Sequence, residues 1–171
     1  MYSLDRSDSL QSDPTHFEYL APVDGDWRRE MTELLLDQLG SSGSIVVYSS
    51  YEKTRLNALP GLYPDLAPRI AAVVERLFDL ERVFKDGYCH PGFGGKTSIK
   101  KVLPVMVENL SYHGMAIGNG DDALGIFSLM RVGKHPPETH ERHRANLLEY
   151  CGLDTRAMVE LHRAVATIAT R

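Results

Sequence analysis

The chain has 171 residues, of which 43% are hydrophobic, and its formal net charge is −4 at pH 7. This is enough apolar material for one domain with a core, and it excludes a chain that is disordered throughout. The negative charge also argues against bulk electrostatic binding of nucleic acid, which relies on a basic surface. Any nucleic-acid contact must therefore be local.

Cys89 and Cys151 are the two cysteines of the chain. They are too few for a disulfide framework, and neither lies in a CxxC pair or in a Cys/His cluster with zinc-finger spacing. Residues 1–12 lack the charged and apolar pattern of a signal peptide, and no segment approaches the roughly 18 consecutive apolar residues of a membrane span. We therefore expect a soluble, cytoplasmic protein with no membrane partner.

The first part of the chain predicts a hairpin, a helix and a buried strand. Short, partly aromatic segments at 1–4 and 16–20 flank a polar run and indicate two strands. Asp26 is a candidate N-cap for a helix that ends at Gly40. The run 44–48 is β-branched and uncharged, which is typical of a strand covered on both faces.

The middle of the chain predicts helices and a loop. A short helix over 51–59 should end at the Pro-Gly pair that follows, and apolar spacing predicts another helix up to residue 77, starting at 66. Residues 80–84 are expected to be extended, and the glycine-rich segment 87–95 should be a loop. Asp79 is interpreted as a residue that caps or terminates a helix.

The last part of the chain predicts three helical regions. Residues 98–106 read as a helix that is kinked or ended near Pro104. Asp121 is a candidate cap for a helix that runs to residue 130. The Pro-Pro dipeptide at 136–137 opens a long C-terminal pair of helices.

Tyr150 and Asp154 are four residues apart within this C-terminal helical pattern, a spacing that places both side chains on one helix face. Apolar residues recur at helical intervals behind them and would fix the helix on a core: Leu153, Ala157, Met158, Leu161, Ala164, Val165 and Ile168. A carboxylate and a phenol would then share one rigid support. The alternative is a buried tyrosine beside an aspartate that caps a helix at a break near Gly152.

Glu52 lies just past the predicted strand 44–48, near a helix start. In α/β sheets, ligands gather beyond the carboxyl ends of the strands, so this carboxylate is a candidate ligand for a cation. The alternative is that Glu52 only stabilises the helix N-terminus through the helix dipole.

Three segments, 45–52, 98–104 and 150–155, follow one another in an order that resembles the bacterial domain-of-unknown-function family 2779. That family is similar to the DnaQ-like 3′-5′ exonucleases of the DEDDy type. The resemblance implies an α/β, ribonuclease-H-like fold with a mixed sheet flanked by helices, in a single domain over 1–171. It also implies hydrolysis of single-stranded DNA or RNA.

The same resemblance implies roles for three residues. In the exonucleases, four carboxylates hold two divalent metals while a tyrosine orients the attacking water. By motif, Glu52 would be the third carboxylate, Asp154 the fourth, and Tyr150 the phenol, with Mg²⁺ or Mn²⁺ as the cofactor. Two such cations, roughly 3.5 to 4 Å apart, repel each other unless several hard oxygen ligands surround them.

The chain departs from the family pattern at the first motif, an Asp-x-Glu on the opening strand. Asp24 and Asp26 sit in a predicted loop, and Asp5 precedes a polar run. We therefore expect a chain that begins at the second strand of the fold, carries an incomplete metal site, and is weakly active or inactive alone. Glu52 also replaces the more usual aspartate, and Ser49 stands where relatives often have asparagine. The alternative function is a catalytically inactive nucleic-acid-binding or interaction module of the same fold.

Lys96, Ser98, Lys100 and Lys101 surround a predicted helix start and are the candidate nucleic-acid contacts. The alternative is that these lysines are simply solvated. The segment 95–97, Gly-Lys-Thr, also matches the end of a phosphate-binding P-loop. However, a histidine occupies the first glycine position and no buried strand leads into the loop, so ATP or GTP binding is disfavoured.

His135, His140 and His143, with Glu138 and Glu141, form a second group of possible metal ligands. The HExxH spacing of zinc proteases is absent, and the polar stretch is typical of the exposed first turns of a helix. The sequence therefore favours a structural interpretation of these residues over a metal site.

Overall fold

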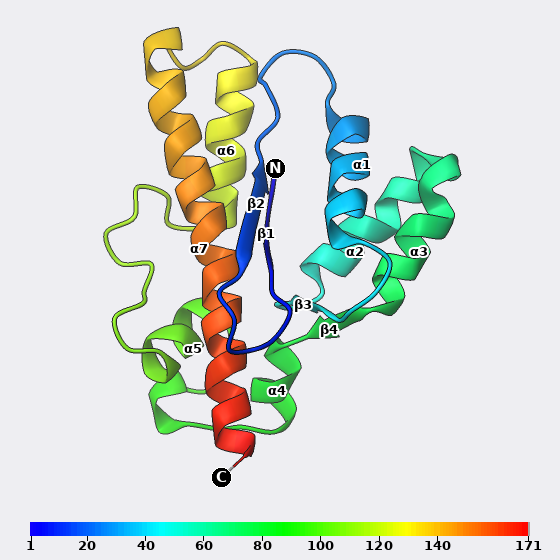
Figure 1. Cartoon of the computed structure of the whole chain (residues 1–171). Helices are drawn as coiled ribbons and strands as arrows, with labels where there is room; N and C mark the ends of the chain where they lie inside the picture. The colour runs from blue at the N-terminus through cyan, green and yellow to red at the C-terminus, as the bar shows by residue number, and fades with distance from the viewer. Residues whose placement is uncertain (171) are drawn as a thin grey trace. The chain divides into compact units, whose positions relative to one another are not determined.

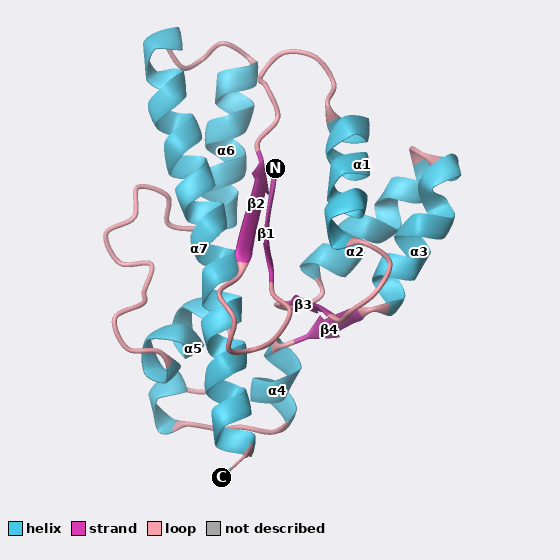
Figure 2. Ribbon diagram, in the orientation of Figure 1, coloured by secondary structure: helices cyan, strands magenta, loops and turns pink. Residues whose placement is uncertain are grey.

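The computed structural model describes residues 1–170. The chain forms two compact units, each built from two separate stretches of sequence. The first unit contains residues 1–31 and 112–156, and the second contains residues 32–111 together with the C-terminal segment that follows residue 156. Both units combine helices with a short sheet, so the predicted α/β class is confirmed (Figure 2).

The sheet of the first unit is the predicted hairpin. Strands β1 (Tyr2–Arg6) and β2 (Thr15–Tyr19) pair antiparallel, with Tyr2 opposite Tyr19 and Asp5 opposite His16. The two tyrosine rings stack with centroids 5.9 Å apart. His16 Nδ1 lies 2.7 Å from Asp5 Oδ1. Cross-strand pairs of these kinds contribute about 0.2–1 kcal/mol each, which helps to hold an otherwise marginal two-stranded ribbon.

Two helices accompany the hairpin in the first unit (Figure 1). Helix α6 (Gly120–Arg131) is capped by Asn119, whose side-chain oxygen accepts the Asp122 backbone N–H at 2.9 Å, so it begins one residue before the predicted cap. Helix α7 (Pro137–Ala169) runs without interruption through Gly152. The predicted C-terminal pair of helices is therefore a single helix, and the predicted alternative of a break at Gly152 is wrong.

The core of the first unit is formed by side chains from α6, α7 and the segments that flank them. Its buried members are Leu20, Ile117, Ala123, Met130, Leu147 and Tyr150. Arg144 on α7 donates to the backbone carbonyls of Leu20 and Ala21, just after β2. The chain leaving the hairpin is thus fixed to α7 by both apolar packing and charge-assisted hydrogen bonds.

The second unit contains a parallel strand pair joined by a helical crossover. Strand β3 (Ile45–Val47) pairs with β4 (Leu77–Asp79), and α2 (Tyr51–Ala58) and α3 (Ala67–Glu75) lie between them in sequence. Helix α1 (Arg28–Leu39) precedes β3 and ends at Gly40, whose φ of 59° is the left-handed conformation that glycine adopts easily. The predictions for α1, β3 and α2 are confirmed within one or two residues.

Strand β4 was not expected. The sequence pattern predicted a helix up to residue 77 and an extended segment at 80–84, but α3 ends at Glu75 and α4 (Glu81–Asp86) occupies most of the second segment. The Arg76 carbonyl accepts the Ile45 N–H at 3.0 Å, which starts the pairing with β3. The Arg76 guanidinium also binds four backbone carbonyls, those of Leu39, Gly40, Ser42 and Gly43. Tertiary pairing thus overrides the local helical pattern.

The second unit is completed by α5 (Ile99–Met106), which contains Pro104 near its end as predicted. One core cluster joins α1, α2 and α3 through Leu36, Leu56, Leu66, Ile70 and Val73. The four strands form two separate two-stranded sheets, one in each unit, where a single mixed sheet was expected. Among residues 1–170, no helix is long and apolar enough to cross a membrane.

Candidate functional site

Tyr150 and Asp154 share one face of the continuous helix α7, as their spacing predicted. Tyr150 is 7% exposed and belongs to the core of the first unit. Burial raises the pKa of its phenol to about 12, and the negative charge of Asp154 adds to this shift. The phenol is therefore protonated at neutral pH and can act as a hydrogen-bond donor.

Tyr112 completes this arrangement, and sequence reasoning missed it. Its hydroxyl donates to Asp154 Oδ1 at 2.6 Å, and its ring lies 6.2 Å from that of Tyr150, centroid to centroid. Tyr112 belongs to the irregular segment between α5 and α6, which has no helical or strand period to mark it. We call Tyr112, Tyr150 and Asp154 the phenol–carboxylate cluster. In it, one oxygen of the carboxylate is oriented by a phenol.

The first strand is attached to α7 beside this cluster. Ser3 and Thr155 share a hydrogen bond of 2.7 Å between their hydroxyl oxygens, and the Thr155 hydroxyl also reaches the Gly152 carbonyl at 3.0 Å. A β-carbon added at Gly152 would lie 3.8 Å from the His16 ring, an ordinary contact distance. The hairpin therefore packs closely on the turn of α7 that carries Asp154.

Glu52 occupies the first turn of α2, directly after the parallel strand β3, as predicted. Its side chain is half-buried, and its Oε2 atom is inaccessible to solvent. Ser49, between the strand and the helix, has a φ of 75°. Serine adopts this left-handed conformation less readily than asparagine or glycine does.

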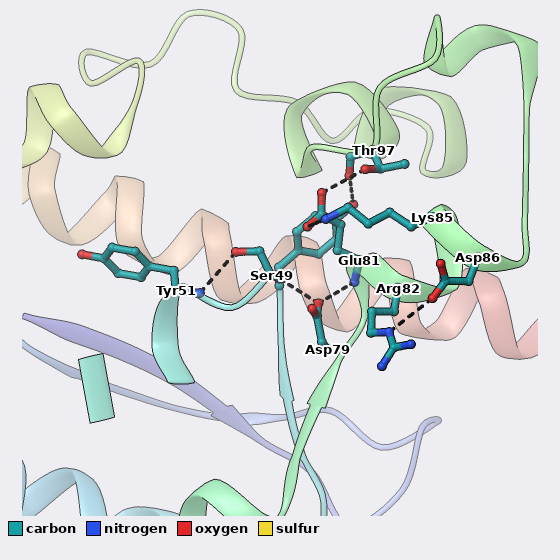
Figure 3. A network of polar contacts seen from close by, with 9 residues as sticks. Ser49, Tyr51, Asp79, Glu81, Arg82, Lys85, Asp86 and Thr97 are labelled. Atoms are coloured by element: carbon teal, nitrogen blue, oxygen red, sulfur yellow. Dashed lines mark hydrogen bonds and ion pairs between the residues drawn. The ribbon is translucent and has the colours of Figure 1, made fainter. Parts of the chain in front are cut away.

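Asp79 fixes the turn that leads to Glu52. Its Oδ1 atom accepts the backbone N–H of Ser49 at 2.8 Å and that of Glu81 at 3.0 Å (Figure 3). The first contact holds the end of β3, and the second satisfies a free N–H at the start of α4. Asp79 ends strand β4, and Leu80 is the N-cap residue of α4, so Asp79 supports the helix start from outside the helix.

A cavity of about 680 Å³ opens at the carboxyl ends of β3 and β4. Its polar and charged lining consists of Ser49, Ser50, Lys53, Asp79, Arg82 and Asp86. Lys53 and Arg82 are cationic, and Arg82 Nε lies 3.2 Å from Asp86 Oδ2. This is the edge at which α/β sheets bind ligands. In the sequence, Glu52 lies between Ser50 and Lys53, which both line the cavity.

Glu81, the first residue of α4, is the centre of a second group of polar contacts (Figure 3). It is 9% exposed, and its two carboxylate oxygens accept hydrogen bonds from the Thr97 hydroxyl at 2.9 Å and from Lys85 Nζ at 2.7 Å. The Tyr48 hydroxyl donates to the Thr97 carbonyl. The hydrogen bond with Glu81 raises the pKa of Lys85, and burial raises that of Tyr48. Thr97 is therefore a structural residue, which accounts for it without a nucleotide.

The predicted nucleic-acid contacts gather at the start of α5. Ser98 is the N-cap residue, but its side chain makes no capping hydrogen bond. Lys96 and Lys101 are exposed, and Lys100 is half-buried. The structure thus places three cationic side chains around one helix N-terminus, where the dipole also favours an anion.

The predicted site residues fall into both units. Tyr150 and Asp154 belong to the first unit, whereas Glu52 belongs to the second, and the convergence of Glu52 with Asp154 on a shared cation stays a prediction. Within the stretch 1–170, no three or more His, Cys, Asp or Glu side chains form a group that could hold a metal ion. Within the same residues, neither Cys89 nor Cys151 is part of a disulfide bond.

The strands and helices thus define a mixed α/β protein with a carboxylate beyond a parallel strand and a phenol–carboxylate cluster on its last helix. Residues 1–98 match the sequence model of the family described as Domain of unknown function (DUF2779). This is more than half of the chain, which therefore belongs to that family. The matched region contains all four strands and Glu52, and the phenol–carboxylate cluster lies beyond it. No significant match was found among curated proteins or among solved structures.

Proposed function

We propose that this chain is a metal-dependent 3′-5′ exonuclease-like domain of the ribonuclease H fold, acting on single-stranded DNA or RNA. The observation that carries the proposal is the phenol–carboxylate cluster. The Tyr-x-x-x-Asp pair lies on an unbroken helix, Tyr150 is protonated at neutral pH, and Asp154 is oriented by Tyr112. A DEDDy-type site requires such a tyrosine beside an aspartate.

Two carboxylates are the proposed ligands of the cofactor. Asp154 and Glu52 offer carboxylate oxygens, the hard ligands that Mg²⁺ and Mn²⁺ prefer. When bound, the cation would stabilise the charge that develops on the phosphodiester oxygens. Asp154 would hold it with Tyr112 fixing the carboxylate, and Tyr150 would donate to the attacking water. Because only two carboxylates are assigned, we expect the activity of this chain alone to be weak.

The order of the strands also supports the proposed fold. Along the chain, a hairpin is followed by a helix and then by a parallel pair with a helical crossover, and the two pairs form separate sheets. Parallel strands with a helical crossover are typical of α/β folds, and β3 and β4 have this arrangement.

A second candidate function is a nucleic-acid-binding module without catalysis. It is favoured by the start of α5, where Lys96, Lys100 and Lys101 surround an N-cap, Ser98, that makes no capping hydrogen bond. Backbone N–H groups at a helix N-terminus and nearby lysines bind phosphate without reading sequence. Such binding needs no metal.

The test of the first candidate is the hydrolysis of 5′-labelled single-stranded DNA and RNA in the presence of Mn²⁺. We expect slow shortening from the 3′ end that requires the metal. Asp154→Asn, Glu52→Gln and Tyr150→Phe should each lower the rate at least about tenfold, since each removes a ligand or the water-orienting phenol. The matched control is Glu149→Gln, at an exposed acid next to Tyr150 on α7. Equal rates for Asp154→Asn and the unmodified chain would refute the exonuclease assignment.

Binding of the same oligonucleotides, followed by fluorescence anisotropy, separates the two candidates. We expect the Lys96→Ala/Lys101→Ala variant to bind more weakly than the unmodified chain, with a reduced salt dependence, because phosphate contacts are lost. Lys134→Ala is the control, since this exposed lysine lies in the other unit. Lysine-dependent binding with no Mn²⁺-dependent hydrolysis would establish the binding module.

A further inference from the structure

Three histidines meet where α6 passes into α7, within the first unit. His135 lies in the connection between the helices, and His140 and His143 lie on the first turns of α7. The His135 and His143 rings are 4.3 Å apart, centroid to centroid, with an angle of 52° between their planes. His140 Nε2 lies 3.0 Å from the His135 backbone carbonyl, which ties the connection to the helix.

The two facing rings carry nitrogen atoms that protein groups do not satisfy. His135 Nε2 and His143 Nδ1 are both inaccessible to solvent, and neither has a hydrogen-bond partner within residues 1–170. Buried polar atoms are nearly always hydrogen-bonded, and leaving one unsatisfied is costly. Two such atoms on rings in contact therefore leave room for a partner that residues 1–170 do not supply.

Histidine side chains are common ligands of metal ions. A neutral imidazole presents a lone pair on one ring nitrogen, which is the form that binds a metal ion.

We propose that His135 and His143 bind one first-row transition metal ion of the Zn²⁺, Ni²⁺ or Cu²⁺ class through Nε2 and Nδ1. Imidazole nitrogen suits these ions, whereas Mg²⁺ and Mn²⁺ prefer oxygen. The site is therefore independent of the proposed exonuclease site and of its cofactor. Because the protein contributes only two ligands, Cu²⁺, which binds most tightly among these ions, is the best probe.

Metal binding at this pair would have a structural effect. The ion would link the connection after α6 to the second turn of α7, closing a short segment of chain that is now held by the contact of His140 with the His135 carbonyl. Any ligand that binds only the folded chain raises its apparent stability. The proposed metal ion would thus stabilise the connection between α6 and α7.

The test uses the full chain without an affinity tag, titrated with CuCl₂ and followed by calorimetry and electron paramagnetic resonance. We expect one tightly bound Cu²⁺ per chain, with a spectrum split by two nitrogen ligands. His135→Ala and His143→Ala should each weaken binding at least about tenfold, because half of the protein's donors are lost. His113→Ala, at an exposed histidine of the same unit, is the matched control and should bind as the unmodified chain does.

A second measurement keeps the proposal testable if an alanine variant folds poorly. In the unmodified chain, Zn²⁺ should shift the ring resonances of His135 and His143 in the NMR spectrum and leave those of His113 in place, and it should raise Tm. His143→Gln, which keeps a polar side chain of similar length, should abolish both effects. Unchanged Cu²⁺ affinity in the His135→Ala/His143→Ala variant, or Zn²⁺ shifts confined to other histidines, would overturn the proposal.

Discussion

Asp154 in the first unit and Glu81 in the second are both carboxylates that accept a hydrogen bond from a hydroxyl group, but their surroundings differ. Glu81 receives one bond from Thr97 and another from the ammonium group of Lys85, so its charge is neutralised within its network. Asp154 receives its bond from the phenol of Tyr112, which orients the carboxylate without supplying a positive charge. The ion pair gives Glu81 a structural role, whereas the phenols beside Asp154 orient its carboxylate.

The largest effect is expected when the apolar packing next to the phenol–carboxylate cluster is removed. Leu147 is fully buried in the core of the first unit, one turn before Tyr150 on α7. Leu147→Ala should lower the free energy of unfolding by about 2–5 kcal/mol, because it leaves a cavity beside Tyr150. Urea denaturation measures this loss. The control is Leu124→Ala on α6, where the side chain is 64% exposed and the change should stay within about 0.5 kcal/mol.

Thr97→Val tests the neutralised carboxylate. The substitution keeps the shape of the side chain but leaves one buried oxygen of Glu81 without its hydroxyl donor. We expect the free energy of unfolding to fall by about 1–3 kcal/mol, the cost of an unsatisfied buried acceptor. Thr54→Val, at an exposed threonine of α2, should change it by less than about 0.5 kcal/mol. A loss no larger than that of Thr54→Val would show that Glu81 does not depend on Thr97.

Tyr112→Phe tests the oriented carboxylate. The variant keeps the ring contact with Tyr150 and loses the hydroxyl that binds Asp154. The expected loss of stability is about 0.5–1.5 kcal/mol, which is smaller than for Thr97→Val because Asp154 is only partly buried. The matched control is Tyr51→Phe, since Tyr51 is 61% exposed. Stability that does not differ between these two variants would contradict the role of Tyr112.

The smallest expected effect concerns the pH dependence of the hairpin. The hydrogen bond to Asp5, with further contributions from Glu18, raises the pKa of His16 above its usual value near 6.5. The folded state therefore binds this proton more tightly, so the stabilisation is complete below about pH 6.5 and is lost as pH rises through the folded pKa. Because the side chain is 42% exposed, solvent screening keeps the effect below about 1 kcal/mol. Comparing urea unfolding of the unmodified chain and His16→Gln at pH 5.5 and 8.5 should show a difference at the lower pH only.

Much of the fold was predictable because local signals were consistent. The capping residue before α1, the glycine after it, the β-branched run of β3 and the Pro-Gly pair after α2 all act over a few residues, and the structure places these elements as expected. The prediction failed at strand β4, because the local signal there disagrees with the tertiary pairing. Its residues continue the apolar spacing of α3, and only the pairing of Arg76 and Leu77 with β3 turns them into a strand.

The candidate sites show the same division. The spacing of Tyr150 and Asp154 was readable because a helix repeats at a known interval. The contact of Tyr112 with Asp154 could not be predicted, because Tyr112 lies in an irregular segment that is distant in sequence. The facing rings of His135 and His143 were visible as residue types, but their contact depends on the path of the chain between α6 and α7.

A single oxygen atom of Asp79 has a further consequence for how this cavity can vary. It accepts two backbone N–H groups, one at the end of β3 and one at the start of α4, and both segments contribute to the cavity wall. The two hydrogen bonds of Asp79 therefore fix one part of the cavity wall. Lys53 and Arg82 also line the cavity, but they take no part in these two bonds. Substitutions of Lys53 or Arg82 can therefore change which ligands the cavity accepts while its shape stays the same. Loss of the Asp79 hydrogen bonds would instead change the shape of the cavity.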